Sequence, residues 1–258
     1  MHRLQCPSQQ AVIRVVPVVD PEADVASDNC QTDVLSISNL NYSWPGARQF
    51  TLSIPSLRLP RGETLYLRGA SGSGKSTLLS AIAGVVDIPA GSISVDGIDV
   101  GQLRGGARDH FRVDHLGIIF QLFNLVPWLS ALENVLLPCR FSALRKKRAG
   151  PSPSKTAERL LAELGLRETA LIQAPAGKLS VGQQQRVAAA RALIGSPGLV
   201  LADEPTSALD ENAKGAFVDL LLRECEAFDT SLLFVSHDRS LESHFGRVVE
   251  LTDLQADS

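Results

Sequence analysis

One stretch decides the fold of this 258-residue chain: Gly69-Ala70-Ser71-Gly72-Ser73-Gly74-Lys75-Ser76-Thr77. It fits the template G-x-x-x-x-G-K-[ST], which forms a phosphate-binding loop when a strand precedes it and a helix follows it. Residues 64–67 predict a short buried strand, and apolar residues recur at helical spacing from Leu78 to Val86. Because both flanks fit, the sequence predicts a phosphate loop rather than a chance glycine-rich turn.

The glycines and polar side chains of this stretch suit phosphate chemistry. Glycines let the backbone curl so that successive N–H groups point at the β- and γ-phosphates, with the positive end of the following helix behind them. Lys75 adds a positive charge for the same phosphates, and the Ser76 hydroxyl is a hard oxygen ligand of the kind that Mg²⁺ prefers. The residues predicted to bind here are Gly69, Ser71, Gly72, Ser73, Gly74, Lys75, Ser76 and Thr77.

The composition narrows the class of protein. The chain is 44% hydrophobic and 21% charged, which predicts one large α/β domain or a domain with an inserted lobe. Its net charge of −3 gives no basic signal for nucleic acid, so none is expected as a partner. No run approaches the ~18 apolar residues of a membrane span, and residues 1–16 lack the apolar core of a secretory signal, so a cytoplasmic protein is expected. The four cysteines are far apart and are interpreted as reduced thiols: Cys6, Cys30, Cys139 and Cys225.

Residues 1–33 are predicted to form a flexible N-terminal extension, since they lack helical periodicity and carry three prolines among polar and acidic residues. One β-prone run within them, residues 11–19, could instead add an edge strand or contact a partner. The extension could also be an artefact of the choice of start site.

From Val34 onward, predicted strands and helices alternate, which indicates a mainly parallel sheet covered on both faces. Residues 122 to about 194 change character, with helices over 131–137 and 155–164 that predict an inserted helical lobe. The run Arg145-Lys146-Lys147-Arg148 at the edge of this lobe is interpreted as a solvated helix end or loop rather than a lipid- or phosphate-binding patch. The predicted strands cover residues 34–40, 50–54, 64–67, 91–97, 117–120, 199–202 and 232–235.

Polar side chains follow two of these strands at their carboxyl ends, where ligands bind in open α/β sheets. Asp203 closes an apolar strand, so its carboxylate is expected at the same sheet edge as the phosphate loop, placed to hold Mg²⁺ through water. Glu204 points elsewhere and is suited to orient or deprotonate an attacking water. Gln121 stands at the corresponding end of the strand over residues 117–120.

A second candidate anion site begins a later helix, at Leu179-Ser180-Val181-Gly182-Gln183. With the other motifs in the same order, the chain from about Val34 to Leu251 resembles the ATP-binding subunit of an ABC transporter, whose signature reads L-S-G-G-Q. The resemblance implies an α/β fold with a P-loop NTPase (RecA-like) core, a small antiparallel β-subdomain and an inserted α-helical subdomain. The implied domain spans residues 34–258, and its helical subdomain spans about 122–194.

The resemblance also implies roles for single residues. Gln121 matches the residue that senses Mg²⁺ and the attacking water, and His237 matches the switch histidine at the γ-phosphate. Ser207-Ala208-Leu209-Asp210 matches a loop that crosses the dimer interface. Trp44 has the spacing from the phosphate loop that is typical of the aromatic residue stacked on adenine, and Tyr42 is the runner-up.

Two positions depart from the family pattern. Val181 replaces the first glycine of the signature pair, and a β-branched residue resists φ > 0, so altered geometry or rate is expected at that anion site. Gly246 stands where relatives often carry Asp, and no consequence follows from the sequence.

The resemblance also implies that two ATP molecules, each with Mg²⁺, bind between two copies of the chain. Each ATP is expected to contact the phosphate loop of one copy and the signature of the other. The residues assigned to catalysis are Lys75, Gln121, Glu204 and His237. Those assigned to Mg²⁺ are Ser76, Gln121 and Asp203. Those added to the nucleotide-binding set beyond the phosphate loop are Trp44, Ser180, Gly182, Gln183 and Asp210.

Within the family, the sequence motifs between Leu116 and Val135 and between Leu201 and Thr206 are similar to those of the lipoprotein-release and macrolide-export ATPases. The expected function is a homodimeric ATPase that drives a separate membrane permease in export or membrane extraction, held by that permease at the inner face of the cell membrane. An import ATPase would share most of the motifs. A non-transport cassette ATPase acting as a scaffold or regulator is a further alternative, whereas a small kinase or GTPase would lack the signature.

Overall fold

The computed structural model describes residues 33–45 and 51–255 of the chain. All of them belong to one compact unit, Gln31–Ser258. The predicted extension over residues 1–33 lies outside the described residues except for Asp33, as does the β-prone run within it. The proposed division of the chain into domains stays a prediction.

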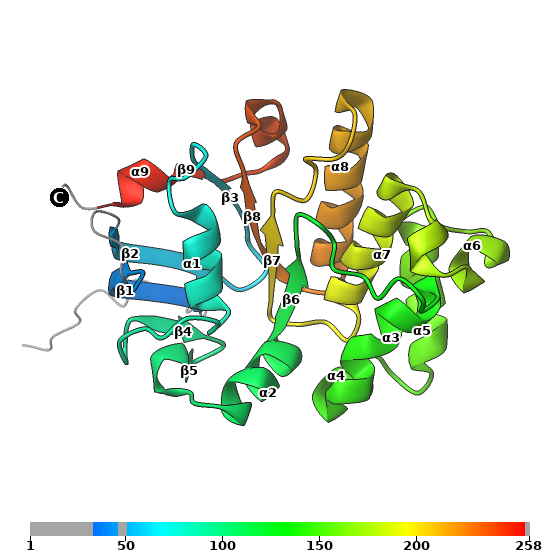
Figure 1. Cartoon of the computed structure of the whole chain (residues 1–258), viewed down its shortest axis with the longest axis horizontal. Coiled ribbons are helices and arrows are strands. Elements are labelled where there is room, and N and C mark those ends of the chain that lie inside the picture. The colour runs from blue at the N-terminus through cyan, green and yellow to red at the C-terminus, as the bar shows by residue number, and fades with distance from the viewer. Residues whose placement is uncertain (1–32, 46–50, 256–258) are drawn as a thin grey trace, which may run out of the picture. The chain divides into compact units, whose positions relative to one another are not determined.

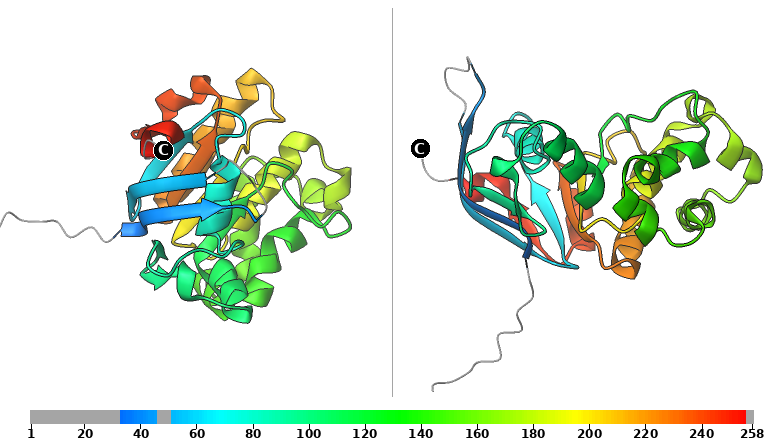
Figure 2. Two further views of the ribbon diagram at one scale, coloured as in Figure 1. Left: turned by 60° about the vertical axis from the view of Figure 1, so that its left-hand side comes forward. Right: turned by 90° about the horizontal axis from the view of Figure 1, so that it is seen from below.

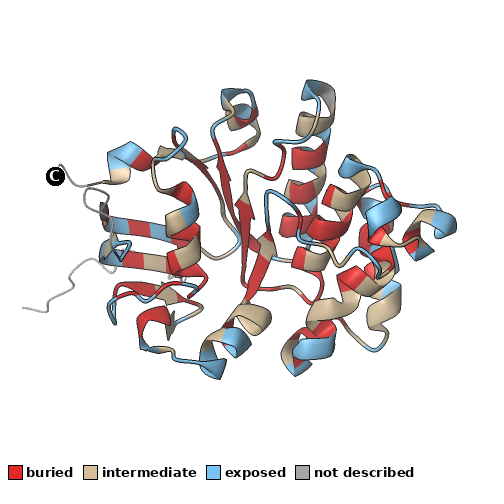
Figure 3. Ribbon diagram, viewed as in Figure 1, coloured by how far each residue is buried: buried red, intermediate tan, exposed pale blue. Residues whose placement is uncertain are grey.

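A five-stranded parallel sheet forms the centre of this unit, with the strand order β6-β7-β8-β3-β9 (Figure 1). Figure 3 shows β7 and β8 buried along most of their length, which is why they read as continuous apolar runs. The short edge strand β9 was not predicted, because only three residues form it and none is buried. The strands are β3 Thr64–Arg68, β6 Leu116–Ile119, β7 Leu199–Asp203, β8 Ser231–Ser236 and β9 Val248–Glu250.

Side chains of the parallel sheet alternate between two hydrophobic cores, because successive residues of a strand point to opposite faces. On β3, Leu65 and Leu67 join the core that contains residues of α1 (Lys75–Ile82) and of the antiparallel sheet. Tyr66, between them, joins the core that contains residues of α7 (Val181–Leu193) and α8 (Glu211–Ala227). The parallel sheet therefore lies between these two cores and contributes side chains to both.

A smaller antiparallel sheet has the order β2-β1-β4-β5. The predicted strands over residues 34–40 and 50–54 are longer in the structure, because β1 and β2 pair along nearly their whole length. The predicted Asp-Gly turn joins β4 to β5, with positive φ at both Asp96 and Gly97. The strands are β1 Asp33–Ser43, β2 Thr51–Pro60, β4 Ile93–Val95 and β5 Ile98–Asp99.

The helices α3 to α6 lie on the side of the parallel sheet opposite to the antiparallel sheet, as the views of Figures 1 and 2 agree in showing. The helices over residues 131–137 and 155–164 are therefore confirmed as elements, with adjusted ends. Their bounds are α3 Ala131–Phe141, α4 Ala143–Arg148, α5 Pro153–Glu163 and α6 Thr169–Gln173. The remaining elements are η1 Val100–Gln102, α2 Gly106–His115, η2 Ala176–Lys178, η3 Arg239–His244 and α9 Leu251–Leu254.

Two local predictions were wrong. The helix after the phosphate loop ends at Ile82 rather than continuing to Val86, because Gly84 adopts φ 63°, which a right-handed helix excludes. The run over residues 145–148 is only partly solvated: Lys146, Lys147 and Arg148 are exposed, but Arg145 is 1% exposed and hydrogen-bonded to backbone carbonyls. The interpretation of the whole run as a solvated helix end therefore fails at its first residue.

Candidate active site

The phosphate loop connects β3 to α1 in the predicted order. Gly72 and Gly74 have φ 80° and 105°, values that side chains with a Cβ rarely adopt. Gly74 is also the N-cap of α1, whose first turn contains no acidic residue. The loop thus presents backbone N–H groups and the positive end of a helix to one hollow, as anion binding requires.

Lys75 lies beneath this loop and is 7% exposed. Its Nζ atom donates to the carbonyl oxygens of Gly69 at 2.6 Å and Ala70 at 3.0 Å. The same atom lies 3.5 Å from Oε1 of Glu204. The ammonium group therefore sits between the loop and the carboxylate at the end of β7.

Asp203 and Ser76 meet as predicted for a metal site. The Ser76 hydroxyl donates to Asp203 Oδ2 at 3.0 Å, while Asp203 Oδ1 is buried and has no hydrogen-bond partner among the described residues. Burial raises the pKa of the Asp203 carboxyl, and the Ser76 hydrogen bond opposes that effect. A buried carboxylate oxygen without a donor is a good ligand position for a hard cation.

Glu204 is held in a constrained position at the end of β7. Its φ is 46°, a left-handed value that costs a residue with a side chain, and its N–H donates to the Val235 carbonyl at 2.9 Å. Its carboxylate lies 2.8 Å from Nδ1 of His237 and accepts a hydrogen bond from the Ser236 hydroxyl at 3.3 Å. With Lys75 on another side, Glu204 is oriented by three groups.

Trp44 reaches the edge of the phosphate loop from the end of β1. Its Nε1 donates to Thr77 Oγ1 at 3.1 Å, and the residue is 43% exposed. Tyr42 packs edge-on against it, with ring centroids 5.4 Å apart. The exposed ring face is suited to stack on a flat heterocycle, and Tyr42 supports Trp44 rather than replacing it.

These side chains surround one cavity of about 650 Å³. The residues that line it are Trp44, Ser71, Gly72, Gly74, Lys75, Ser76, Thr77, Gln121, Glu204 and His237. Gly69 and Ser73 are packed within the loop itself, where a Cβ at Gly69 would lie 2.7 Å from Ser73 Oγ. The cavity thus brings together residues from five separate parts of the sequence.

The signature residues do not line this cavity. Ser180 is the N-cap of α7: its Oγ accepts from Gln183 N at 3.3 Å, while Gln183 Oε1 accepts from Ser180 N at 2.9 Å. Gly182 lies in the same first turn, and Asp210 is exposed at the N-cap of α8. Ser180 and Asp210 are exposed, and none of the four lines the cavity beside the phosphate loop, which we name the nucleotide cavity.

The altered backbone geometry expected at Val181 is absent, whereas the expected effect on rate stays a prediction. Val181 is the first residue of α7, and it is not among the described residues with positive φ. A β-branched side chain fits this backbone without strain, and Val181 is 47% exposed. Its replacement of glycine therefore changes the surface of the anion site and not its backbone.

An ion pair beside His237 was not predicted from the sequence. Lys214 Nζ, on α8, lies 2.7 Å from Asp238 Oδ2 and 2.7 Å from Glu211 Oε1. The hydrogen bond to Asp238 raises the pKa of Lys214 to about 12, and the reciprocal bond lowers the pKa of Asp238 to about 2. The pair ties the start of α8 to the residue after His237, and no local sequence pattern predicts a contact across that separation.

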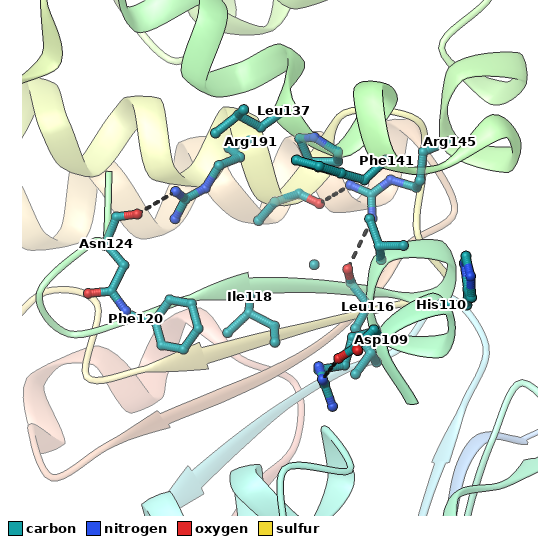
Figure 4. Close-up of a pocket in the computed structure, with 15 residues that line it drawn as sticks. Asp109, His110, Leu116, Ile118, Phe120, Asn124, Leu137, Phe141, Arg145 and Arg191 are labelled. Atoms are coloured by element: carbon teal, nitrogen blue, oxygen red, sulfur yellow. Dashed lines mark hydrogen bonds and ion pairs between the residues drawn. The ribbon is translucent and has the colours of Figure 1, made fainter. Parts of the chain in front are cut away.

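A second cavity, of about 520 Å³, lies beside the segment that carries Gln121. Figure 4 shows Ile118 and Phe120 on one side of it and Leu137 and Phe141 on the other. Phe120 is 39% and Phe141 71% exposed, so apolar rings remain open to solvent here. We name this feature the β6 groove.

A family pattern and individual relatives of known sequence both match this chain. The sequence pattern of the family described as ABC transporter matches residues 52–207. The lipoprotein-releasing system ATP-binding protein LolD of Syntrophotalea carbinolica is 38% identical over 222 residues, which cover 85% of this chain and 95% of that protein. The ABC transporter ATP-binding protein YbbA of Escherichia coli is 42% identical over 199 residues, which cover 77% and 85%.

Solved structures of an ATP-binding cassette are also similar to this chain. A dimeric post-hydrolysis state of the ATP-binding cassette MJ0796, bound to ADP and Pi, has a TM-score of 0.72 and 32% sequence identity to this chain. The match covers 87% of this chain and 97% of that one. A second dimeric structure of that bacterial ABC transporter cassette matches with a TM-score of 0.71.

Proposed function

The chain belongs to the ABC transporter family, and we propose that it works as a Mg²⁺-dependent homodimer that drives a separate membrane permease. The resemblance to the lipoprotein-release branch and the predicted P-loop fold are confirmed. ATP binding and hydrolysis follow from the family. The proposal adds the dimer, the metal, the permease, the direction of transport and the residues that perform each step.

One observation carries the proposal: Lys75, Ser76, Gln121, Glu204 and His237 converge on one cavity beside the phosphate loop. In it, the loop amides and Lys75 hold the β- and γ-phosphates, while Trp44 stacks on the adenine. Glu204 orients or deprotonates the water that attacks the γ-phosphate, and His237 interacts with the charge that develops there. The contact between Glu204 and His237 fixes both groups before the reaction.

The residues present suit a Mg²⁺ ion. The Ser76 hydroxyl and the Asp203 carboxylate already contact each other, and the buried Asp203 Oδ1 lacks a donor. Gln121 lines the same cavity as Ser76 and would supply a third oxygen. The ion would neutralise charge on the β- and γ-phosphate oxygens.

The outward position of the signature supports the homodimer. Ser180, Gly182, Gln183 and Asp210 do not reach the nucleotide cavity of their own chain, so they are available to the nucleotide of a second copy. The N-terminus of α7 offers N–H groups to a phosphate. In the solved relative MJ0796 the cassettes are dimeric.

The β6 groove supports the permease partner. It is lined largely by apolar side chains and is open, as the groove that accepts an amphipathic helix of a partner should be. Phe120 and Asn124 line this groove, while Gln121 between them lines the nucleotide cavity. No described helix is long and apolar enough to cross a membrane. We propose that the permease bound in this groove holds the chain at the inner face of the cell membrane, with export or membrane extraction as its work.

Affinity purification of the Glu204→Gln protein from its own membranes, with ATP and Mg²⁺, tests this function. The expected result is a stoichiometric multi-span membrane protein that copurifies with the chain. Recovery of soluble proteins alone, with the ATP-dependent dimer intact, would favour a non-transport cassette ATPase. A permease that accompanies a periplasmic or surface binding protein would favour import.

A further inference from the structure

The buried side chain of Arg145 joins three segments of the chain that are far apart in sequence. Its Nε donates to Ile194 O at 2.6 Å, its Nη1 to Leu116 O at 3.0 Å and its Nη2 to Ala192 O at 2.8 Å. These carbonyls belong to the start of β6 and to the C-terminal end of α7. All three bonds come from one planar guanidinium, which is 1% exposed at the level of the residue.

The backbone around Arg145 is built for this contact. A Cβ at Gly117 would collide with the Ala192 carbonyl, and one at Gly195 would collide with the carbonyl of Arg145 itself. Glycine at these two positions lets β6, α4 and the end of α7 approach closely. Ser142 N-caps α4 by accepting from Arg145 N at 2.9 Å, and its hydroxyl also donates to Asp114 of α2.

The charge of Arg145 is compensated without a direct carboxylate contact. The carbonyls at the C-terminal end of α7 carry the negative end of the helix dipole, which favours a cation there. Burial lowers the pKa of Arg145 to about 10, so the side chain remains charged at neutral pH. A fixed charge with three fixed acceptors holds its geometry more firmly than apolar packing does.

Both elements that Arg145 joins lead to the reaction site. Gln121, in the nucleotide cavity, follows β6 after one residue, and the signature residue Ser180 is the N-cap of α7. Arg191 of α7 ties the other end of the same segment, because it donates to Asn124 O at 2.7 Å (Figure 4). It also donates to Phe123 O at 2.6 Å. Residues 116–124 are thus held to α7 at both ends.

We propose that Arg145 is a positioning residue for ATP hydrolysis, which sets β6 and α7 relative to each other so that Gln121 and Ser180 are in place together. A strand and a helix move as stiff units, so a change at the Arg145 junction reaches both of their distant ends. The phosphate loop is not part of this junction. The proposal rests on ATP hydrolysis in the proposed homodimer, and failure of the permease proposal leaves it intact.

Steady-state kinetics of Arg145→Lys in the full chain test this role. Lysine keeps the charge but cannot reach three carbonyls from one planar group. We expect kcat for ATP hydrolysis to fall on the order of tenfold, as misplacement of reacting groups does. The KM for ATP should change by less than about twofold, because the phosphate loop is untouched.

Two controls separate positioning from stability. Lys147→Ala, on the exposed side of the same helix α4, should leave kcat and KM unchanged. Arg145→Ala should lose the same activity as Arg145→Lys and regain part of it when millimolar guanidinium, but not equimolar sodium, is added. A lowered melting temperature with unchanged kcat per folded molecule would overturn the proposal, since that result describes a structural role only. Equal losses in ATP binding and in kcat would also overturn the proposal.

Discussion

At the scale of single residues, Asp203 is the proposed Mg²⁺ ligand, although burial disfavours the charged form of its carboxyl group. Its pKa is raised, so the folded chain binds the proton more tightly than the unfolded chain does between the two pKa values. Stability of the nucleotide-free chain therefore falls as pH rises through that window. We predict that Asp203→Asn raises the free energy of unfolding at pH 7 by on the order of 1 kcal/mol, the scale of one poorly satisfied buried polar group, while Mg²⁺-dependent hydrolysis falls.

Denaturant melts of the nucleotide-free proteins from about pH 4 to pH 8 check this prediction. The advantage of the variant should shrink toward acid, because the wild-type carboxylate is then protonated in both states. The exposed Asp253→Asn serves as a matched control and should show no advantage at any pH. A pH-independent advantage would mean that packing, and not the buried charge, is responsible.

Glu204 gives the second prediction at this scale. Glu204→Gln retains the shape of the side chain next to His237 and Ser236 but removes the base. We expect kcat to fall by roughly 10² to 10⁴, with ATP affinity retained because the phosphate loop is unchanged. Phosphate release and equilibrium binding of a fluorescent ATP analogue measure the two quantities. Unchanged turnover would assign the base to another group.

At the scale of elements, the N-terminus of α7 serves the fold and the proposed dimer through the same residue. Ser180 forms a capping box with Gln183, and Asp caps a helix as well as Ser does. Ser180→Asp should therefore change the free energy of unfolding by less than about 0.5 kcal/mol. The added carboxylate would repel the γ-phosphate bound by a second copy, so ATP-dependent dimers should be lost.

Ultracentrifugation in the Glu204→Gln background, with and without ATP, measures this loss. Ser180→Ala provides the comparison: it should cost about 1 kcal/mol of stability through the lost cap and weaken the dimer less than Asp does. If Ser180→Asp dimerises as well as its parent, the signature of one copy does not contact the nucleotide of the other.

Elements defined by local pattern could be predicted from the sequence, and those defined by distant partners could not. The phosphate loop and the strands β3, β7 and β8 carry apolar runs and motifs within a few residues of each other. The helix α2 escaped prediction because Phe111 is its only buried residue. Arg145 looked like part of a solvated run because its acceptors on α7 lie 47 and 49 positions away.

The residues of the candidate site likewise fall into two groups, those that the sequence predicts and those that it does not. Residues that share a motif with the phosphate loop or end an apolar strand were predicted, and the structure brings Trp44, Gln121, Glu204 and His237 to one cavity. The partners that hold them in place, such as Ser236 and the Lys214–Asp238 pair, carry no motif of their own. Their positions follow from the packing of α8 against β8, which sequence pattern alone does not specify.

At the scale of the whole molecule, two cavities share one stretch of chain. Phe120 and Asn124 face the β6 groove, and Gln121 between them faces the nucleotide cavity. A helix bound in the groove is therefore in contact with the segment that carries Gln121. We predict that Phe141→Asp removes the permease from the purified Glu204→Gln complex, because a charge replaces an apolar ring that is 71% exposed in the groove.

Mass spectrometry of the purified complex measures this effect, and a matched variant controls for the added charge. Val248, 39% exposed on β9, lies at the edge of the parallel sheet away from α3 and α4 (Figure 1), so Val248→Asp should leave the permease bound. The melting temperature and the binding of a fluorescent ATP analogue should match the parent in both variants, since neither side chain is part of a core. Retention of the permease by Phe141→Asp would place the docking surface elsewhere, whereas its loss from both variants would show that any added charge disrupts the complex.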